Sequence, residues 1–162
     1  MESIDEEERI ARVTGALAAL GYNVAMKIVA ESTHTAEMAA AAAGCELGQI
    51  VKTLAIYVSG TPRLALVAGD RRLDDRLVAT HFGVGRKQIK LASAEQVLAL
   101  TGYPVGGVSP FGLPAPLGVL VDEGLRRFET VWVAGGTASA IFPIELVDLL
   151  RLTAGIFVSV AT

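Results

Sequence analysis

The chain has 162 residues, of which 52% are hydrophobic and 19% charged, and its formal net charge is −3. This length fits one domain, which buries roughly 70% of its unfolded surface without disulfides or metals. The composition excludes a largely disordered chain, and the acidic balance excludes a broad nucleic-acid surface and a DNA partner. Since no apolar run approaches the roughly 18 residues of a membrane helix, we expect a soluble protein with no membrane partner.

The N-terminal segment is acidic and lacks the basic start and apolar stretch of a signal peptide, so we expect a cytoplasmic protein. Cys45 is the single cysteine and cannot form an internal disulfide. Two histidines and one cysteine do not make a zinc-type ligand set, so we expect no metal and no other cofactor. We assign Cys45 a packing role, and His81 a place in the core or at a helix C-terminus.

The first predicted element is a helix over about residues 4–20. Ser3 and Glu6 have the spacing of a capping box, and apolar residues recur at helical intervals until Gly21. The alternation that follows, in residues 22–30, predicts a strand. Its buried face would hold Val24, Met26 and Ile28.

An Ala-rich helix is predicted within residues 32–45, with Thr or Ser as its N-terminal cap and Gly44 at its end. The segment 51–58 is rich in Val, Ile, Leu and Tyr and ends in a Ser-Gly turn, so it predicts a strand. A second apolar strand over 64–70 follows at once. Together they predict an antiparallel hairpin.

Further elements follow to the C-terminal end. They are a helix within 72–83, a short strand at 87–91, a helix at 94–101, strands at 119–125 and 129–136, a helix that begins at Pro143, and a strand at 155–160. Since neither a repeat nor a linker divides the chain, we predict one domain, 1–162. Its fold class is mixed α/β of the α+β kind, with a central mixed, largely antiparallel sheet or partly closed barrel surrounded by helices.

Two features depart from what a plain core requires. Lys52 shares a strand face with Leu54, Ile56 and Val58, so its ammonium either reaches water along its own stem or serves chemistry. Residues 102–118 are rich in glycine and hold four of the six prolines, which favours a long ordered loop. Loops of this kind are usually functional.

Three segments carry a resemblance to a known family. They are "QIVKTL" at 49–54, "GYPVGGVSPFG" at 102–112 and "VWVAGG" at 131–136. In this order and spacing they resemble the YbaK/ProX family of aminoacyl-tRNA deacylases, which is related to the editing insertion of bacterial prolyl-tRNA synthetases. The resemblance spans about 34–155, the motif-bearing core, and it implies a YbaK-like fold.

The resemblance implies a hydrolase that removes a small amino acid from the 3′ end of mischarged tRNA, without a cofactor. It places Lys52 and the loop with Gly107 at the catalytic site, and the aminoacyl-tRNA 3′ end between them. The substrate-binding residues that it implies are Gly106, Val108, Ser109, Pro110, His34, Gly135 and Gly136. An aminoacyl-tRNA synthetase is a further possible partner, and a homodimer is a possible assembly.

The chemistry of these residue types agrees with the resemblance. Glycines let the backbone approach a ligand, so successive N–H groups can converge on the oxyanion of ester hydrolysis, each contributing roughly 3–4 kcal/mol. We expect Lys52 to position the terminal phosphate or ester, with water as the nucleophile. Ser109 has neither a nucleophile elbow nor an evident base, so we expect it to line the pocket or cap the loop instead.

The chain also departs from the family pattern. Ala134 stands where a serine is expected, and Pro143 where an aspartate is expected, so the specificity is left open. We expect an apolar pocket wall near Ile141 and Phe142. His34 has two interpretations, a substrate contact and a helix cap or surface role.

Alternative interpretations remain. The basic pairs 71–72, 86–87 and 126–127 are solvated side chains, or one of them contacts tRNA phosphates. A non-catalytic module that binds an aminoacyl or nucleotide end, or docks on a synthetase, is the alternative function. A structural homodimer domain is a third and leaves the glycine loop unexplained.

Overall fold

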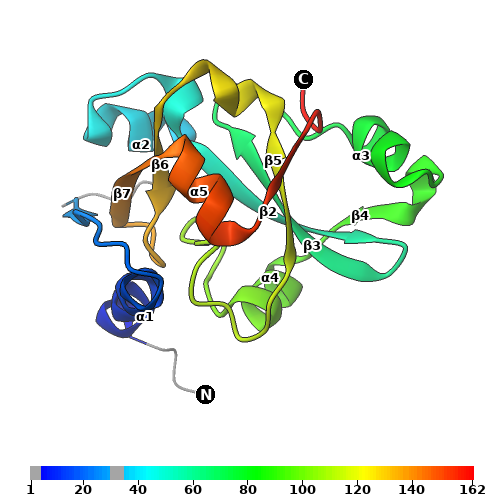
Figure 1. Cartoon of the computed structure of the whole chain (residues 1–162). Helices are drawn as coiled ribbons and strands as arrows, with labels where there is room; N and C mark the ends of the chain where they lie inside the picture. Colours follow the sequence, from blue (N-terminus) through cyan, green and yellow to red (C-terminus); the bar gives the residue numbers. More distant parts are fainter. Residues whose placement is uncertain (1–4, 30–34) are drawn as a thin grey trace.

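The computed structural model describes residues 5–29 and 35–162 (Figure 1). Within these ranges the α-helices are α1 (Glu6–Ala19), α2 (Ala36–Ala43), α3 (Asp75–Phe82), α4 (Ala94–Thr101) and α5 (Leu146–Thr153). The strands are β1 (Lys27–Ile28), β2 (Val51–Val58), β3 (Thr61–Ala68), β4 (Ile89–Leu91), β5 (Gly118–Asp122), β6 (Thr130–Ala134), β7 (Ala140–Glu145) and β8 (Ile156–Val158). Short 3₁₀ helices are η1 (Leu47–Gln49), η2 (Arg86–Gln88) and η3 (Glu123–Arg127).

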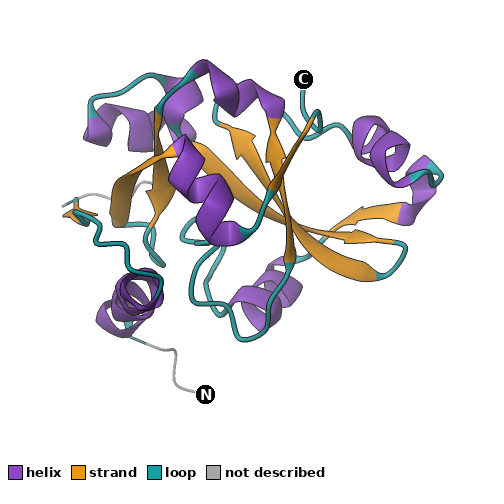
Figure 2. Cartoon of the chain, viewed as in Figure 1, coloured by secondary structure: helices purple, strands orange, loops and turns teal. Residues whose placement is uncertain are grey.

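The strands form two sheets that lie against each other (Figure 2). The larger sheet has the order β4-β2-β3-β5-β8, with antiparallel pairs around β2 and parallel pairs around β5. The smaller sheet, β1-β7-β6, is antiparallel. A bridge between Ile50 and Trp132 connects the two sheets. The predicted mixed α/β fold class is therefore confirmed, as is the hairpin of 51–58 with the following strand.

The hydrophobic core fills the space between the sheets, and it includes side chains from α1, α4, α5 and the 102–118 loop. A second apolar cluster covers the opposite face of the larger sheet, where α3 packs. Alternate residues of β3 enter the two clusters, with Leu64 and Leu66 on one face and Ala65 and Val67 on the other. The central strands are thus buried on both faces, which explains their nearly continuous apolar sequence.

Local capping signals set most helix ends. Ser93 and Gln96 form the capping box of α4, and Gly102 ends this helix in the left-handed region. Gly44 and Gly83 end α2 and α3 in the same way. The predicted helix at 94–101 is confirmed. Ser3, the predicted cap of the first helix, lies outside the described residues, and the side chain of Asp5 caps α1.

Three predicted elements differ from the structure. The segment from Pro143 belongs to β7, and the helix begins at Leu146. β1 begins at Lys27, opposite Ile141, so the edge of β7 beside Pro143 has no partner strand and the missing N–H of this proline carries no penalty. The strand over 22–30 is reduced to β1, where Ile28 is exposed.

The third difference concerns the strand predicted over 119–125, which ends at Asp122. There the side chain of Asp122 accepts a hydrogen bond from the backbone N–H of Gly124, and η3 begins. The aspartate thus stops the strand and turns the chain into the 3₁₀ helix.

Candidate functional site

A cavity of about 280 Å³ lies between β2, the smaller sheet and the 102–118 loop. The residues that line it are mainly apolar or small. They are Thr35, Ala36, Ala39, Ile50, Val51, Lys52, Thr53, Leu54, Ala55, Leu91, Ala92, Val97, Val105, Gly106, Val108, Trp132, Ala134 and Ile141. Lys52 is the charged side chain in this set, so the cavity is an apolar pocket with one cation at its wall.

The predicted pair of Lys52 and the glycine loop meets at this cavity. Lys52 is the second residue of β2, while Gly106 and Val108 come from the loop, and all three line the same space. Gly106 has φ 95°, a left-handed backbone conformation that favours glycine and brings the main chain to the cavity wall.

The other predicted loop residues stabilise the loop on the side away from the cavity. The N–H of Gly107 donates to the carbonyl of Pro104 (3.0 Å), and a Cβ on Gly107 would lie 2.6 Å from Cα of Thr137. The hydroxyl of buried Ser109 accepts from the N–H of Phe111 (3.2 Å). Pro110 is buried beside it, and none of these three residues lines the cavity.

A buried tyrosine closes the loop. The hydroxyl of Tyr103 donates to the carbonyl of Phe111 at 2.5 Å, so one side chain connects the two ends of the 103–111 segment. Burial raises the pKa of Tyr103 to about 12. The guanidinium of Arg12, on α1, lies 5.9 Å from the centre of its ring. The glycine loop is therefore held in one shape before any ligand arrives.

Gly135 and Gly136 are buried away from the cavity. The N–H of Gly135 donates to the carbonyl of Ala140 (2.8 Å), and the carbonyl of Gly136 accepts from Nε of Arg9 (2.9 Å). They serve the β6–β7 turn and its contact with α1. His34, the remaining predicted residue, lies outside the described residues.

Of the two residues predicted to form an apolar wall, one lines the cavity. Ile141 lines the cavity, whereas Phe142 points the other way into the hydrophobic core. Ala134, where the family pattern suggests serine, lies on the wall. Sequence reasoning missed Thr53 and Trp132. Strict alternation of β6, with Val131 and Val133 buried and Trp132 on the opposite face, was a signal that could have found the tryptophan.

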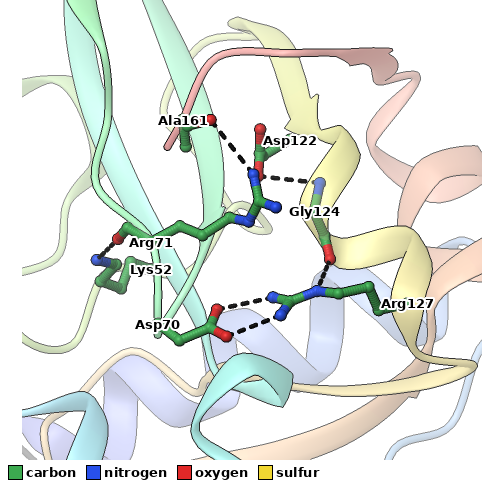
Figure 3. A network of polar contacts seen from close by, with 7 residues as sticks. All are labelled: Lys52, Asp70, Arg71, Asp122, Gly124, Arg127 and Ala161. Atoms are coloured by element: carbon green, nitrogen blue, oxygen red, sulfur yellow. Dashed lines mark hydrogen bonds and ion pairs between the residues drawn. The ribbon is translucent and has the colours of Figure 1, made fainter.

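The electrostatic setting of Lys52 is unusual for a lysine. Its ammonium donates a hydrogen bond to the carbonyl of Arg71 (Figure 3). Burial lowers the pKa of Lys52 below its ordinary value and the charge of Arg72 lowers it further, while Glu37 and Asp70 oppose the shift. The ammonium of Lys52 has thus lost part of its hydration, and its charged form gains from an added anion.

Lys52 also borders a second, more polar depression of about 480 Å³, lined by Glu37, Arg72 and the turn after β3 among others. Of the basic pairs, Arg86 pairs with Asp75 and Arg126 with Glu123. Arg72 is exposed at this depression, next to Lys52, which makes it the best placed of these arginines for a phosphate.

The remaining predicted residues have structural positions. Cys45 packs beside Ala39, Ala40 and Ile50, and burial raises the pKa of its thiol. His81 is exposed in the last turn of α3. Of the two predicted places, the core and a helix C-terminus, it therefore occupies the second. Among the described residues, no helix has the length and apolar character needed to cross a membrane.

Comparisons with known proteins bear on this geometry. A family model described as the aminoacyl-tRNA editing domain matches residues 30–152. A solved structure described as a candidate trans-editing enzyme for prolyl tRNA synthetase is 36% identical, with a TM-score of 0.89 over 99% of both chains.

Two curated relatives differ in size. The proline–tRNA ligase of Maridesulfovibrio salexigens is 40% identical over 109 residues, which are 67% of this chain and 18% of the ligase. A protein of Enterococcus faecalis, named as a candidate Cys-tRNA(Pro)/Cys-tRNA(Cys) deacylase, is 29% identical over 133 residues, covering 82% of this chain and 80% of that protein.

Proposed function

Since the chain belongs to the aminoacyl-tRNA editing domain family, we propose that it is a trans-editing deacylase that hydrolyses the 3′ ester of a mischarged tRNA. The observation that carries the proposal is the shared cavity of Lys52, Gly106 and Val108. Its substrate is the aminoacylated 3′ adenosine, in the cytoplasm, where charged tRNA is used.

In the reaction, the oxygen of a water molecule attacks the ester carbonyl carbon and negative charge develops on the carbonyl oxygen. The bond between this carbon and the ribose oxygen then breaks, the ribose oxygen takes the proton that the attacking water gives up, and the free amino acid leaves. An aminoacyl ester is already reactive, so binding, desolvation and a few hydrogen-bond donors supply the acceleration.

The donors to the oxyanion come from the loop. The N–H of Gly107 is used by Pro104, whereas those of Gly106 and Val108 have no acceptor within 5–29 and 35–162. We therefore assign the oxyanion contacts to Gly106 and Val108, in place of Gly107. Lys52 holds the anionic or ester end of the substrate across the cavity from them.

The cavity suits a small, uncharged amino acid. Its walls are apolar, and an ionised side chain placed there without a partner would lose several kcal/mol of hydration. The name of the Enterococcus faecalis relative makes cysteine the first amino acid to test, followed by alanine, serine and proline.

The test is a panel of tRNAs charged with these amino acids and, as negative controls, with lysine and arginine, whose positive charges would lie near Lys52. We expect the protein to release at least one small amino acid about tenfold or more faster than buffer. Lys52→Ala should lower kcat/KM about 100-fold, whereas Lys87→Ala, an exposed lysine of η2, should leave it within about twofold. Binding of charged tRNA without any turnover would instead identify a non-catalytic module.

We further propose that a synthetase supplies the substrate. The net charge of −3 provides few phosphate contacts, so affinity for tRNA alone is expected to be weak. Adding prolyl-tRNA synthetase to the assay should lower the tRNA concentration at half-maximal rate, and an unrelated synthetase should not.

A further inference from the structure

The carbonyl that receives Lys52 belongs to the tight turn at residues 69–72, directly after β3. The main chain of this turn is tied down on both sides. The N–H of Gly69 donates to the carbonyl of Ile50 (2.7 Å), and the N–H of Arg71 donates to that of Ala68 (2.9 Å). The position of the Lys52 ammonium therefore depends on where this turn lies.

A bidentate ion pair between Arg127 and Asp70 holds the turn in place. Nη1 and Nη2 of Arg127 donate to the two carboxylate oxygens of Asp70 at 2.8 and 2.7 Å, while Nε donates to the carbonyl of Gly124 at 2.6 Å. Figure 3 shows Asp70 next to Arg71 on this turn, and Lys52, from β2, reaching the carbonyl of Arg71. Every donor atom of the Arg127 guanidinium is thus engaged in one fixed geometry.

The segment that binds Arg127 is itself anchored in the core by Asp122. Asp122 is fully buried, and its carboxylate accepts from the N–H groups of Gly124 (3.0 Å) and Val160 (3.2 Å). A Cβ on Gly124 would lie 2.5 Å from Nε of Arg71, so the glycine makes room for that side chain, which reaches the carbonyl of Ala161. Strand β5, η3 and the turn form one connected unit.

We propose that Asp70 and Arg127 are positioning residues for Lys52, holding the 69–72 turn so that the ammonium stays at the cavity wall. The inference rests on the proposed function for its catalytic consequence, but its structural content does not need it. Neither Asp70 nor Arg127 lines the cavity, and in this proposal they act through the carbonyl of Arg71.

The solvent exposure of the Asp70–Arg127 ion pair indicates that its role is to position Lys52 and not to stabilise the fold. The side chains of Arg127 and Asp70 are 40% and 34% exposed, and ion pairs of this kind add little to folding stability. Fixed geometry, by contrast, is what a planar guanidinium and a carboxylate supply. Loss of the pair is therefore expected to move Lys52 while leaving the fold in place.

The first test measures Lys52 itself, by the pH dependence of its acylation with acetic anhydride, followed by mass spectrometry. The charged groups that act on it are Arg72, Glu37 and Asp70. Glu37→Gln removes a carboxylate that raises the pKa of Lys52, so this pKa should fall. Asp70→Asn removes an equal charge but also releases the turn and rehydrates the ammonium, so the pKa should rise.

Opposite signs for the two matched substitutions support the proposal, while a fall or no change in Asp70→Asn overturns it. The two variants should melt within about 3 °C of the parent, which confirms that both are folded. This test needs no deacylase activity, so it decides the positioning role even if the proposed function fails.

The second test is kinetic and uses two adjacent arginines of η3. Arg127→Leu should lower kcat about tenfold or more with KM within about threefold, since a misplaced group costs rate more than binding. Arg126→Leu is the matched control, because Arg126 also has an ion pair and an aromatic contact but lies outside the turn's hydrogen bonds. Equal effects of the two substitutions on kcat would contradict the proposal.

Discussion

Ala134 lies directly opposite Ile141 across β6 and β7, and both side chains line the cavity. Cross-strand partners point to the same face of a sheet, so together they form one patch of the cavity wall. Any enlargement at position 134 therefore takes space from the ligand.

Ala134→Val adds two methyl groups to this wall. We expect the largest amino acid that the parent accepts to lose at least about tenfold in kcat/KM, while the smallest is affected less. The measurement is the tRNA panel described above. Ala115→Val, in the exposed part of the 102–118 loop, is the control, and an equal fall for every amino acid would contradict a size limit at position 134.

Gly107→Ala tests how tightly the loop is packed. The new Cβ would meet the backbone of Thr137 at 2.6–2.8 Å, and neither main chain can move without disturbing its neighbours. We expect a loss of about 2 kcal/mol or more in the free energy of unfolding, measured by urea denaturation. Gly85→Ala, where a Cβ has open space, should stay within about 0.5 kcal/mol of the parent, and equal stabilities would refute the packing argument.

Tyr103 should make stability fall at high pH. Burial raises its pKa to about 12 in the folded protein, above the usual 10, so the unfolded chain releases this proton first. The stabilisation from the neutral phenol is complete below pH 10 and is lost as the pH rises from 10 to 12. Thermal unfolding across this range should show a steeper fall for the parent than for Tyr103→Phe.

The same variant should be less stable than the parent at pH 7. It leaves the carbonyl of Phe111 without its 2.5 Å partner, which costs about 1–2 kcal/mol. Parallel stability curves for the two proteins between pH 10 and 12 would show that Tyr103 does not titrate in the way proposed.

Asp122→Ala should cost about 3 kcal/mol, because two buried N–H groups, those of Gly124 and Val160, lose a charged acceptor. Glu123→Ala, next in the chain and exposed, should cost less than about 0.5 kcal/mol. Chemical denaturation of both variants provides the comparison. Similar losses would mean that the buried carboxylate does not hold η3.

Sequence reasoning succeeded where the signal is local. The ends of α3 and α4 follow from Gly83 and Gly102, whose left-handed conformations need no distant partner. It failed at Pro143, because whether a proline begins a helix or sits in a strand depends on which edge of the sheet it faces, and β1 sets that edge from more than a hundred residues away.

The candidate site divides in the same way. The motifs placed Lys52 and the glycine loop in one predicted site, and in the structure Lys52 and Gly106 line the same cavity. The motifs did not reveal that the N–H of Gly107 donates a hydrogen bond to the carbonyl of Pro104, because the hydrogen bonds of a turn depend on its backbone angles. Asp70 and Arg127 lie 57 residues apart, and charged residues at such a distance carry no pattern that identifies them as a pair.

Helix α1 lies before the segment that matches the editing family, yet Val13 and Leu17 are completely buried in the hydrophobic core. Arg9 and Arg12 of the same helix contact the β6–β7 turn and Tyr103. A transplant of residues 30–152 into another host protein would expose the apolar surface that this helix covers. A transplanted domain must therefore include α1, or the host protein must cover the same apolar surface.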